Sequence, residues 1–183
     1  MKMLACLAGT AVLMLAVGCV PSVNPVYTDN ELVFDEALVG TWVLETSPGT
    51  WVFAKRDPSS YQIVYSDKDG KQCRLVGRLA KIQGTLFLDI CPEAMDIEAN
   101  ALYKFHLAPI HTIYLVVRTG PTPQLAAMNH KWLEQYLDEH PDEIAAATVN
   151  GRKLITASTK DLQAFVLRHK EAFTGELIAK RIH

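Results

Sequence analysis

Two cysteines and two histidines in the middle of the chain are the side chains best suited to sulfur or metal chemistry. Cys73 and Cys91 lie on the two arms of a predicted hairpin, and a turn centred on Ile82 would place them opposite each other, near disulfide range. His106 and His111 flank the next turn, so the four side chains are also of the types that bind zinc. Their spacing lacks the short cysteine or histidine pairs typical of zinc sites. We therefore expect a disulfide, with two free thiols as the alternative, and no metal.

A carboxylate within an apolar strand is the other candidate for chemistry. Asp89 shares a strand face with Phe87 and Cys91, because alternate residues of a strand point to the same side. If that face is inward, Asp89 is buried and must find a partner or change its pKa. It would be a polar anchor for a ligand, a catalytic acid, or, as we favour, a structural partner of Arg74, Arg78 or backbone amides.

The sequence offers no recognisable nucleophile with an adjacent base. The motifs of serine hydrolases, zinc proteases, P-loop enzymes and dinucleotide-binding enzymes are absent from it. An enzyme would need Asp89 and a histidine to meet within hydrogen-bonding distance in a cleft. We therefore expect a protein without enzymatic activity and without a cofactor.

The composition indicates a folded chain with little net charge. It has 183 residues, of which 49% are hydrophobic and 21% are charged, and its formal net charge is -2. The apolar fraction is too high for an intrinsically disordered protein. The charge is too close to zero for a protein that binds nucleic acid through a basic surface. The length allows one domain or at most two small ones.

The first residues have the organisation of a signal peptide. One positive charge is followed by an uncharged, largely apolar run over residues 3–17, which is short for a transmembrane helix and typical of a signal-peptide core. The run ends in Leu-Ala-Val-Gly-Cys at residues 15–19, which resembles the lipobox of bacterial lipoproteins, although leucine is usual where Ala16 stands. The resemblance implies that the chain is cut after Gly18. It also implies that Cys19 carries a diacylglycerol and a further acyl chain such as palmitate.

Several acyl chains anchor a protein stably, so the lipobox implies attachment to a membrane of the bacterial cell envelope through Cys19. Val20 rather than aspartate follows the cysteine, which favours the outer membrane, facing the periplasm. An ordinary cleaved signal peptide with an incidental cysteine, or an uncleaved N-terminal anchor, is the alternative. We expect residues 1–18 to be the signal peptide, residues 19–30 a proline-containing tether and residues 31–183 a single domain.

Short segments of β-branched and aromatic residues, separated by turn residues, predict sequential antiparallel strands after a helical turn at residues 31–38. The predicted strands cover residues 39–45, 50–54, 61–65, 72–80, 85–90, 101–107, 112–118, 153–157 and 176–182. Apolar residues at helical spacing, preceded by capping residues, predict helices over residues 130–139 and 159–170. The regular spacing of the strands favours a barrel or a strongly curled sheet.

Gly40-Thr41-Trp42, at the start of the first predicted strand, resembles the Gly-x-Trp signature of lipocalins and related calycin barrels. The resemblance covers roughly residues 31–120. It implies that Trp42 closes one end of a barrel and that a late basic residue, here Arg181, packs over its ring. The two C-terminal helices are more than lipocalins usually carry, and the alternative is that Trp42 is simply a core aromatic residue.

The predicted fold class is α+β: an antiparallel, lipocalin-like barrel or strongly curled sheet with two helices in the C-terminal third. We consider two non-enzymatic functions. In the first, which the resemblance to calycins implies, a cavity above ~300 Å³ binds a small hydrophobic ligand. Strand alternation suggests that the residues lining it are Trp51, Phe53, Tyr61, Phe87, Asp89 and Phe105. In the second, the core is solid and the domain is an interaction or assembly component of the outer membrane, with the helix of Trp132 and Tyr136 as a contact face.

Overall fold

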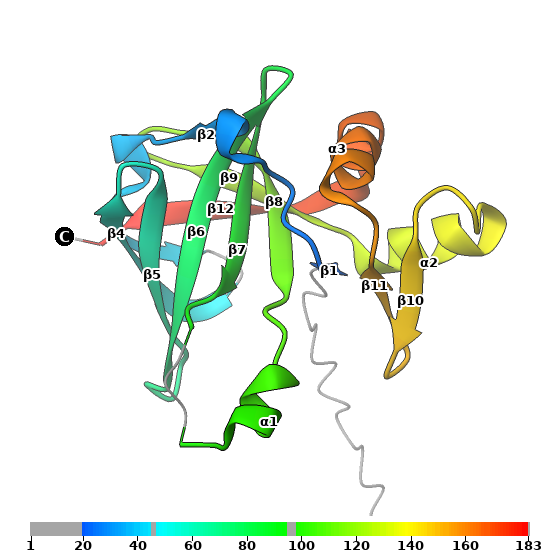
Figure 1. Cartoon of the computed structure of the whole chain (residues 1–183). Coiled ribbons are helices and arrows are strands. Elements are labelled where there is room, and N and C mark those ends of the chain that lie inside the picture. The colour runs from blue at the N-terminus through cyan, green and yellow to red at the C-terminus, as the bar shows by residue number, and fades with distance from the viewer. Residues whose placement is uncertain (1–19, 45–46, 95–97, 183) are drawn as a thin grey trace, which may run out of the picture.

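The computed structural model of the chain describes residues 20–44, 47–94 and 98–182 (Figure 1). The strands, in chain order, are β1 (Pro21–Ser22), β2 (Leu32–Val33), β3 (Gly40–Leu44), β4 (Ser47–Asp57), β5 (Ser60–Ser66), β6 (Gln72–Ile82), β7 (Thr85–Pro92), β8 (His111–Arg118), β9 (Gln124–Met128), β10 (Ala146–Val149), β11 (Arg152–Ile155) and β12 (Phe173–Arg181). The α-helices are α1 (Ala101–Phe105), α2 (His130–Glu139) and α3 (Thr159–Arg168), and the 3-10 helices are η1 (Asp29–Glu31), η2 (Glu36–Leu38) and η3 (Lys170–Ala172).

All these strands belong to one sheet. Its main path is β10-β11-β1-β8-β7-β6-β5-β4-β3-β12-β9, and β2 pairs with β6. Among the ladders of the described residues, only that between β1 and β11 is parallel. Strand β8 is shared, because its first residues pair with β1 and its later residues pair with β9. The ladder between β8 and β9 curls the sheet strongly, while β1 and β11 extend it to an edge at β10.

The predicted fold class is wrong. Strands make up 46% and helices 22% of the structure, so it is mainly β, and the sheet continues past β8 to an open edge at β10 instead of forming a simple closed lipocalin-like barrel. A third helix, α1, joins the two that were predicted. The sheet differs from a simple barrel because the N-terminal segment and the β10–β11 hairpin add strands beyond β8.

The segment after residue 19 is part of the sheet rather than the predicted tether. Ser22 lies opposite residues of both β8 and β11. Val20 and Val26 are only 4% and 0% exposed, so the segment contributes side chains to the core. The proline content was misleading, because proline is tolerated as the first residue of a strand, where Pro21 lies.

The hairpin of β6 and β7 has a tight two-residue turn. Gln83 and Gly84 both have positive φ, 46° and 82°, which is typical of a type I′ turn between antiparallel strands. Ile82 therefore pairs with Thr85. The register differs from that of a turn centred on Ile82, which was the basis of the predicted cysteine pairing.

Residues 101–107, predicted as a strand, form α1 and the turn that follows it. The Asn100 side chain accepts a hydrogen bond from the backbone N–H of Tyr103 at 2.9 Å, which caps the helix. The turn continues to Leu107, whose N–H donates to the carbonyl of Lys104. Apolar and aromatic residues in so short a segment fit a strand or a helix, and the asparagine before them favours the helix.

The two C-terminal helices begin at the predicted capping residues. Asn129 accepts hydrogen bonds from the backbone N–H groups of Lys131 and Trp132, and Ser158 accepts one from that of Asp161. Each cap satisfies donors that have no partner inside the first turn. The helices lie beside the sheet rather than within its curl (Figure 1).

The sheet buries a different core on each of its two faces. The inner core lies within the curl and consists of Leu38, Trp42, Phe53, Tyr61, Ile63, Leu79, Leu88, Ile90, Tyr114, Val116, Ala127 and Ala179. The outer core joins the sheet to the N-terminal segment, α2 and α3, and includes Val20, Val26, Phe87, Ile113, Leu133, Leu137, Ile155, Leu162, Phe165, Val166 and Phe173.

Candidate functional site

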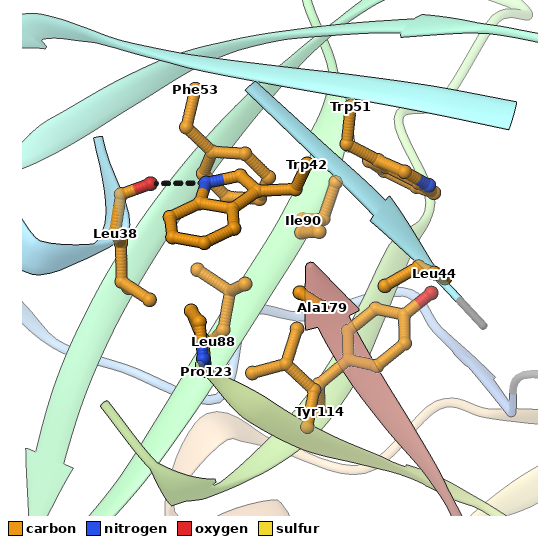
Figure 2. A pocket seen from close by; sticks show the side chains of 11 residues that line it. Leu38, Trp42, Leu44, Trp51, Phe53, Leu88, Ile90, Tyr114, Pro123 and Ala179 are labelled. Atoms are coloured by element: carbon orange, nitrogen blue, oxygen red, sulfur yellow. Dashed lines mark hydrogen bonds between the residues drawn. The ribbon is translucent and has the colours of Figure 1, made fainter. Parts of the chain in front are cut away.

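The inner core contains a small apolar hollow (Figure 2). It is lined by side chains from strands that face each other across the curl: Leu38, Trp42, Leu44, Trp51, Phe53, Leu88, Ile90, Tyr114, Pro123, Leu125 and Ala179. The cavity volume is about 40 Å³. Ligand pockets usually have about 300–1,000 Å³, and one water molecule takes up about 30 Å³ in the liquid. The hollow therefore has no room for a hydrophobic ligand.

Trp42 is held in the wall of this hollow by contacts on two sides. Its Nε1 donates a hydrogen bond to the carbonyl oxygen of Leu38 at 2.9 Å (Figure 2). The guanidinium carbon of Arg181 lies 5.0 Å from its ring centre, and Arg181 Nη2 donates to the carbonyl oxygen of Val39 at 2.6 Å. The structure thus contains the contact between Arg181 and Trp42 that the Gly-x-Trp resemblance implied.

Gly40 makes room for this arrangement. A Cβ atom at this position would lie 3.0 Å from Nη2 of Arg181, and the φ of Gly40 is +150°. Both the close approach and the backbone conformation favour glycine. The packing of Arg181 against Gly40 and over the Trp42 ring therefore explains why glycine stands two residues before the tryptophan.

Two of the six predicted ligand-binding residues, Trp51 and Phe53, line the hollow. The Trp51 ring packs on Tyr65, with 4.6 Å between ring centres. Its Nε1 is buried and has no hydrogen-bond partner among the described residues. Figure 2 shows this nitrogen on the side of the ring that is farther from Trp42.

Tyr61, a third predicted ligand residue, is fully buried in the same core but does not line the hollow. Its hydroxyl accepts a hydrogen bond from the N–H of Asp35 at 2.8 Å and donates one to the carbonyl oxygen of Asp35 at 3.1 Å. Burial raises the pKa of Tyr61 to about 12, so the phenol stays protonated at neutral pH. Its hydroxyl fixes the segment before β3.

The other three predicted ligand residues lie elsewhere. Strand β7 directs Leu88 and Ile90 into the inner core, so Phe87 and Asp89 point to the outer face. Phe105 is the last residue of α1. Alternation shows which residues of a strand share a face but does not show which face is inward. Both faces of β7 are buried, and Phe87 and Asp89 lie on the outer one. Their predicted inward placement was therefore wrong.

On the outer face, Asp89 and His111 form a buried pair. Oδ1 of Asp89 lies 2.6 Å from Nδ1 of His111, and the two side chains are 1% and 10% exposed. Oδ2 of Asp89 accepts a hydrogen bond from the backbone N–H of Val26 at 2.9 Å. Asp89 therefore has the backbone amide that we expected and a histidine in place of an arginine, although Arg78 lies opposite it on β6.

The contact between Asp89 and His111 meets the distance condition for an acid–base pair, but its surroundings give it a structural role. Both carboxylate oxygens already have partners in the chain. Neither residue lines either of the two hollows described here. Through Val26, the pair fastens the N-terminal segment to the outer face of the sheet.

The predicted disulfide between Cys73 and Cys91 is wrong, because both are free thiols. Cys91 lies opposite Val76, and Cys73 lies opposite Tyr65 of β5. Since Cys73 and Val76 are three positions apart on β6, the two cysteines point to opposite faces of the sheet. Burial, with the nearby charge of Asp89, raises the pKa of the Cys91 thiol.

Within the described ranges, no group of three or more histidine, cysteine or acidic side chains is arranged to hold a metal.

Trp132 and Tyr136, predicted to form a contact face, instead pack between α2 and α3. Their rings are stacked 4.7 Å apart, and both contact Phe165 of α3. His140 stacks on Tyr136 at 4.4 Å, and the buried His169 lies 4.7 Å from the Tyr136 ring. This face of α2 is therefore only partly exposed and joins the two helices.

A second hollow, of about 310 Å³, lies between α3 and the segment that follows α2. It is lined by Asp142, Glu143, Ile144, Ala145, Asp161, Ala164, Phe165 and Arg168. Glu143 and Arg168 form an ion pair in its wall. With so many charged groups, this hollow does not suit a hydrophobic ligand.

Most residues of the inner hollow were missed from sequence, among them Leu88, Tyr114 and Ala179. One signal could have found some of them. Trp42 marks the inner face of β3, and its cross-strand partner Trp51 extends that face to β4. The remaining residues could be assigned only with the strand order and register in hand.

The comparisons with known proteins yield no relative: no family model, no curated protein and no solved structure matches the chain. In the ranges that the structure describes, no helix is long and apolar enough to cross a membrane. Cys19 and the predicted signal peptide lie outside those ranges. What this chain does must therefore be inferred from its own sequence and geometry.

Proposed function

We propose that the chain is a lipid-anchored protein of the bacterial cell envelope, held in the outer membrane by acylated Cys19 and facing the periplasm. Its domain acts through its outer surface, as an interaction or assembly component, and catalyses no reaction. The lipobox-like residues 15–19 support the anchor, and Val20 at the following position supports the outer membrane.

The observation that carries the surface role is the filled inner core. A domain that carries a small hydrophobic molecule needs a cavity of at least ~300 Å³, and the hollow beside Trp42 has about 40 Å³. The larger hollow beside α3 is lined by charged side chains. The small volume of the first hollow and the charged lining of the second favour a domain that works by surface contact over one that encloses a hydrophobic ligand.

The anchor is tested by replacing the cysteine in the full chain. Cys19→Ser should abolish incorporation of labelled fatty acid and release the domain from the membrane fraction, because the thiol that forms the thioether is gone. Cys6→Ser is the matched control, since it removes the other cysteine of the same N-terminal segment, and it should leave labelling unchanged. Fatty acid that still appears at residue 19 after Cys19→Ser would refute the proposal.

The surface role is tested by native mass spectrometry of the full-length lipoprotein released from detergent. The expected mass is that of the polypeptide with its acyl groups and nothing else bound. A hydrophobic molecule that co-purifies in equal amount, and is lost when Trp42 or Phe53 is replaced, would instead favour the ligand-carrying function.

A further inference from the structure

Helix α1 and the turn after it carry large apolar side chains into solvent. Leu102, Tyr103 and Leu107 are 71%, 58% and 51% exposed. Tyr103 lies within α1, and Leu107 follows two residues after the helix ends at Phe105, with its N–H donating to the carbonyl of Lys104. Clustered apolar side chains on a surface usually mark a contact site.

This segment is joined directly to the strand beside the start of the described chain. The residues after Leu107 lead into His111, the first residue of β8, and His111 lies opposite Ser22 of β1. Val20 is only 4% exposed, so the residue directly after Cys19 is already packed in the core. Consecutive Cα atoms are about 3.8 Å apart, which leaves no slack between an acylated Cys19 and the sheet.

A second apolar projection lies on the other side of β1. Strand β1 is between β8 and β11. The β10–β11 hairpin carries Val149, which is the last residue of β10 and is 49% exposed, and the exposed Arg152 after the turn. Figure 1 shows α1 and the β10–β11 turn both reaching below β1, toward the same end of the molecule. The first described residues are thus flanked by two projections with apolar side chains.

The charge of the α1 segment suits a membrane surface. From residue 99 to residue 112 the sequence contains Lys104 and no acidic residue. Tyrosine and leucine are also side chains that enter the boundary between headgroups and acyl chains. Anionic headgroups would therefore meet no carboxylate within this segment.

We propose that this end of the domain is a membrane-contact face, in which Leu102, Tyr103 and Leu107, with Val149 on the other side, insert into the lipid surface beside acylated Cys19. The inference rests on the proposed lipid anchor and adds an orientation to it. With no slack at Val20, the domain lies against the bilayer instead of moving freely above it.

The test uses the full, acylated chain in vesicles of phosphatidylethanolamine and phosphatidylglycerol whose acyl chains are brominated. Leu107→Trp adds a fluorophore to the proposed face, and Val117→Trp adds one at a site that is 49% exposed near the other end of β8. The unsubstituted protein gives the background from the native tryptophans. We expect the brominated lipid to quench the added emission of Leu107→Trp by about twofold or more, and to leave that of Val117→Trp unchanged.

A second variant keeps the test independent of the label. Leu102→Ser with Tyr103→Ser, added to Leu107→Trp, should reduce the quenching, because the apolar contact with the lipid is weakened. Mass spectrometry of the same samples reports acylation of Cys19. Acylated protein in which both added tryptophans escape quenching would overturn the membrane-contact face and leave the anchor intact. Protein without an acyl group at Cys19 would overturn the anchor and, with it, this inference.

Discussion

The two faces of β7 show how differently one strand can be used. On the inner side, Leu88 and Ile90 belong to a core of aliphatic and aromatic side chains, around a hollow of about 40 Å³. On the outer side, Phe87 packs in an apolar layer, while Asp89 forms a buried pair with His111 and holds Val26. The side chains of the inner face fill the interior of the curled sheet. Those of the outer face attach the N-terminal segment to the sheet. The polar pair that β7 buries therefore lies outside the curl of the sheet.

The largest effect is expected on the outer face. Asp89→Ala should lower the free energy of unfolding by about 3–5 kcal/mol, because it leaves His111 and the N–H of Val26 buried without their partner. Urea denaturation measures this loss. Hydrogen exchange at Val26 should also become faster than in the unsubstituted protein.

Asp89→Asn is the matched control, because it keeps the shape and an oxygen that can accept the Val26 hydrogen bond. Its cost should be smaller, about 1–3 kcal/mol. If Asp89→Ala and Asp89→Asn both leave the urea midpoint unchanged, the outer pair does not hold the segment and the contrast between the two faces fails.

A somewhat smaller effect is expected on the inner face. Leu88→Ala should cost about 2–5 kcal/mol and enlarge the hollow, because Leu88 is fully buried in its wall. Enlarged apolar cavities bind xenon or benzene, so the variant should gain such binding while the unsubstituted protein shows none.

Leu79→Ala is the control for the position of the new space. Leu79 pairs with Leu88 and is 1% exposed, but it does not line the hollow. It should destabilise the domain to a similar extent and enlarge the hollow less. Xenon bound by the unsubstituted protein in the inner core would show that this face holds more room than the structure gives it.

The smallest effect concerns thiol chemistry and leaves stability unchanged. At pH 8, Cys73 should react with a maleimide or iodoacetamide at least about tenfold faster than Cys91, because Cys73 is exposed and burial raises the pKa of Cys91. A raised pKa means less thiolate at a given pH, so raising the pH should speed the labelling of Cys91. Mass spectrometry after timed labelling separates the two sites.

Asp89→Asn sharpens this test. The negative charge of Asp89 contributes to the raised pKa of Cys91, so removing the charge should speed labelling at Cys91 and leave Cys73 unchanged. Protein purified under oxidising conditions in which neither cysteine reacts until a reductant is added would contradict the free thiols of the structure.

Local signals predicted the elements whose ends are fixed by nearby residues. Asn129 and Ser158 cap α2 and α3 where expected, and α2 covers the predicted residues. Caps depend on contacts within a few residues, so sequence alone reveals them.

Features set by distant contacts were missed. Strands β9 and β10 are rich in alanine, which has a low strand propensity, and they form because β12, β8 and β11 offer ladders to pair with. The predicted cysteine pairing failed because the turn lies at Gln83 and Gly84 instead of being centred on Ile82. This shift places Cys91 opposite Val76 instead of Cys73. The candidate ligand site failed in part because both faces of β7 are buried.

The long-range attachment of β1 sets an order of events for the proposed anchor. Residues of the N-terminal segment bind residues more than a hundred positions later: Asn24 donates to the carbonyl of Ala157, and Gln163 donates to that of Val26. These partners are made late when the chain is synthesised. Until then, Asn24 and Val26 lack the two contacts. On the proposed anchor, acylation and cleavage at Cys19 would therefore have their best access before the last third of the chain folds.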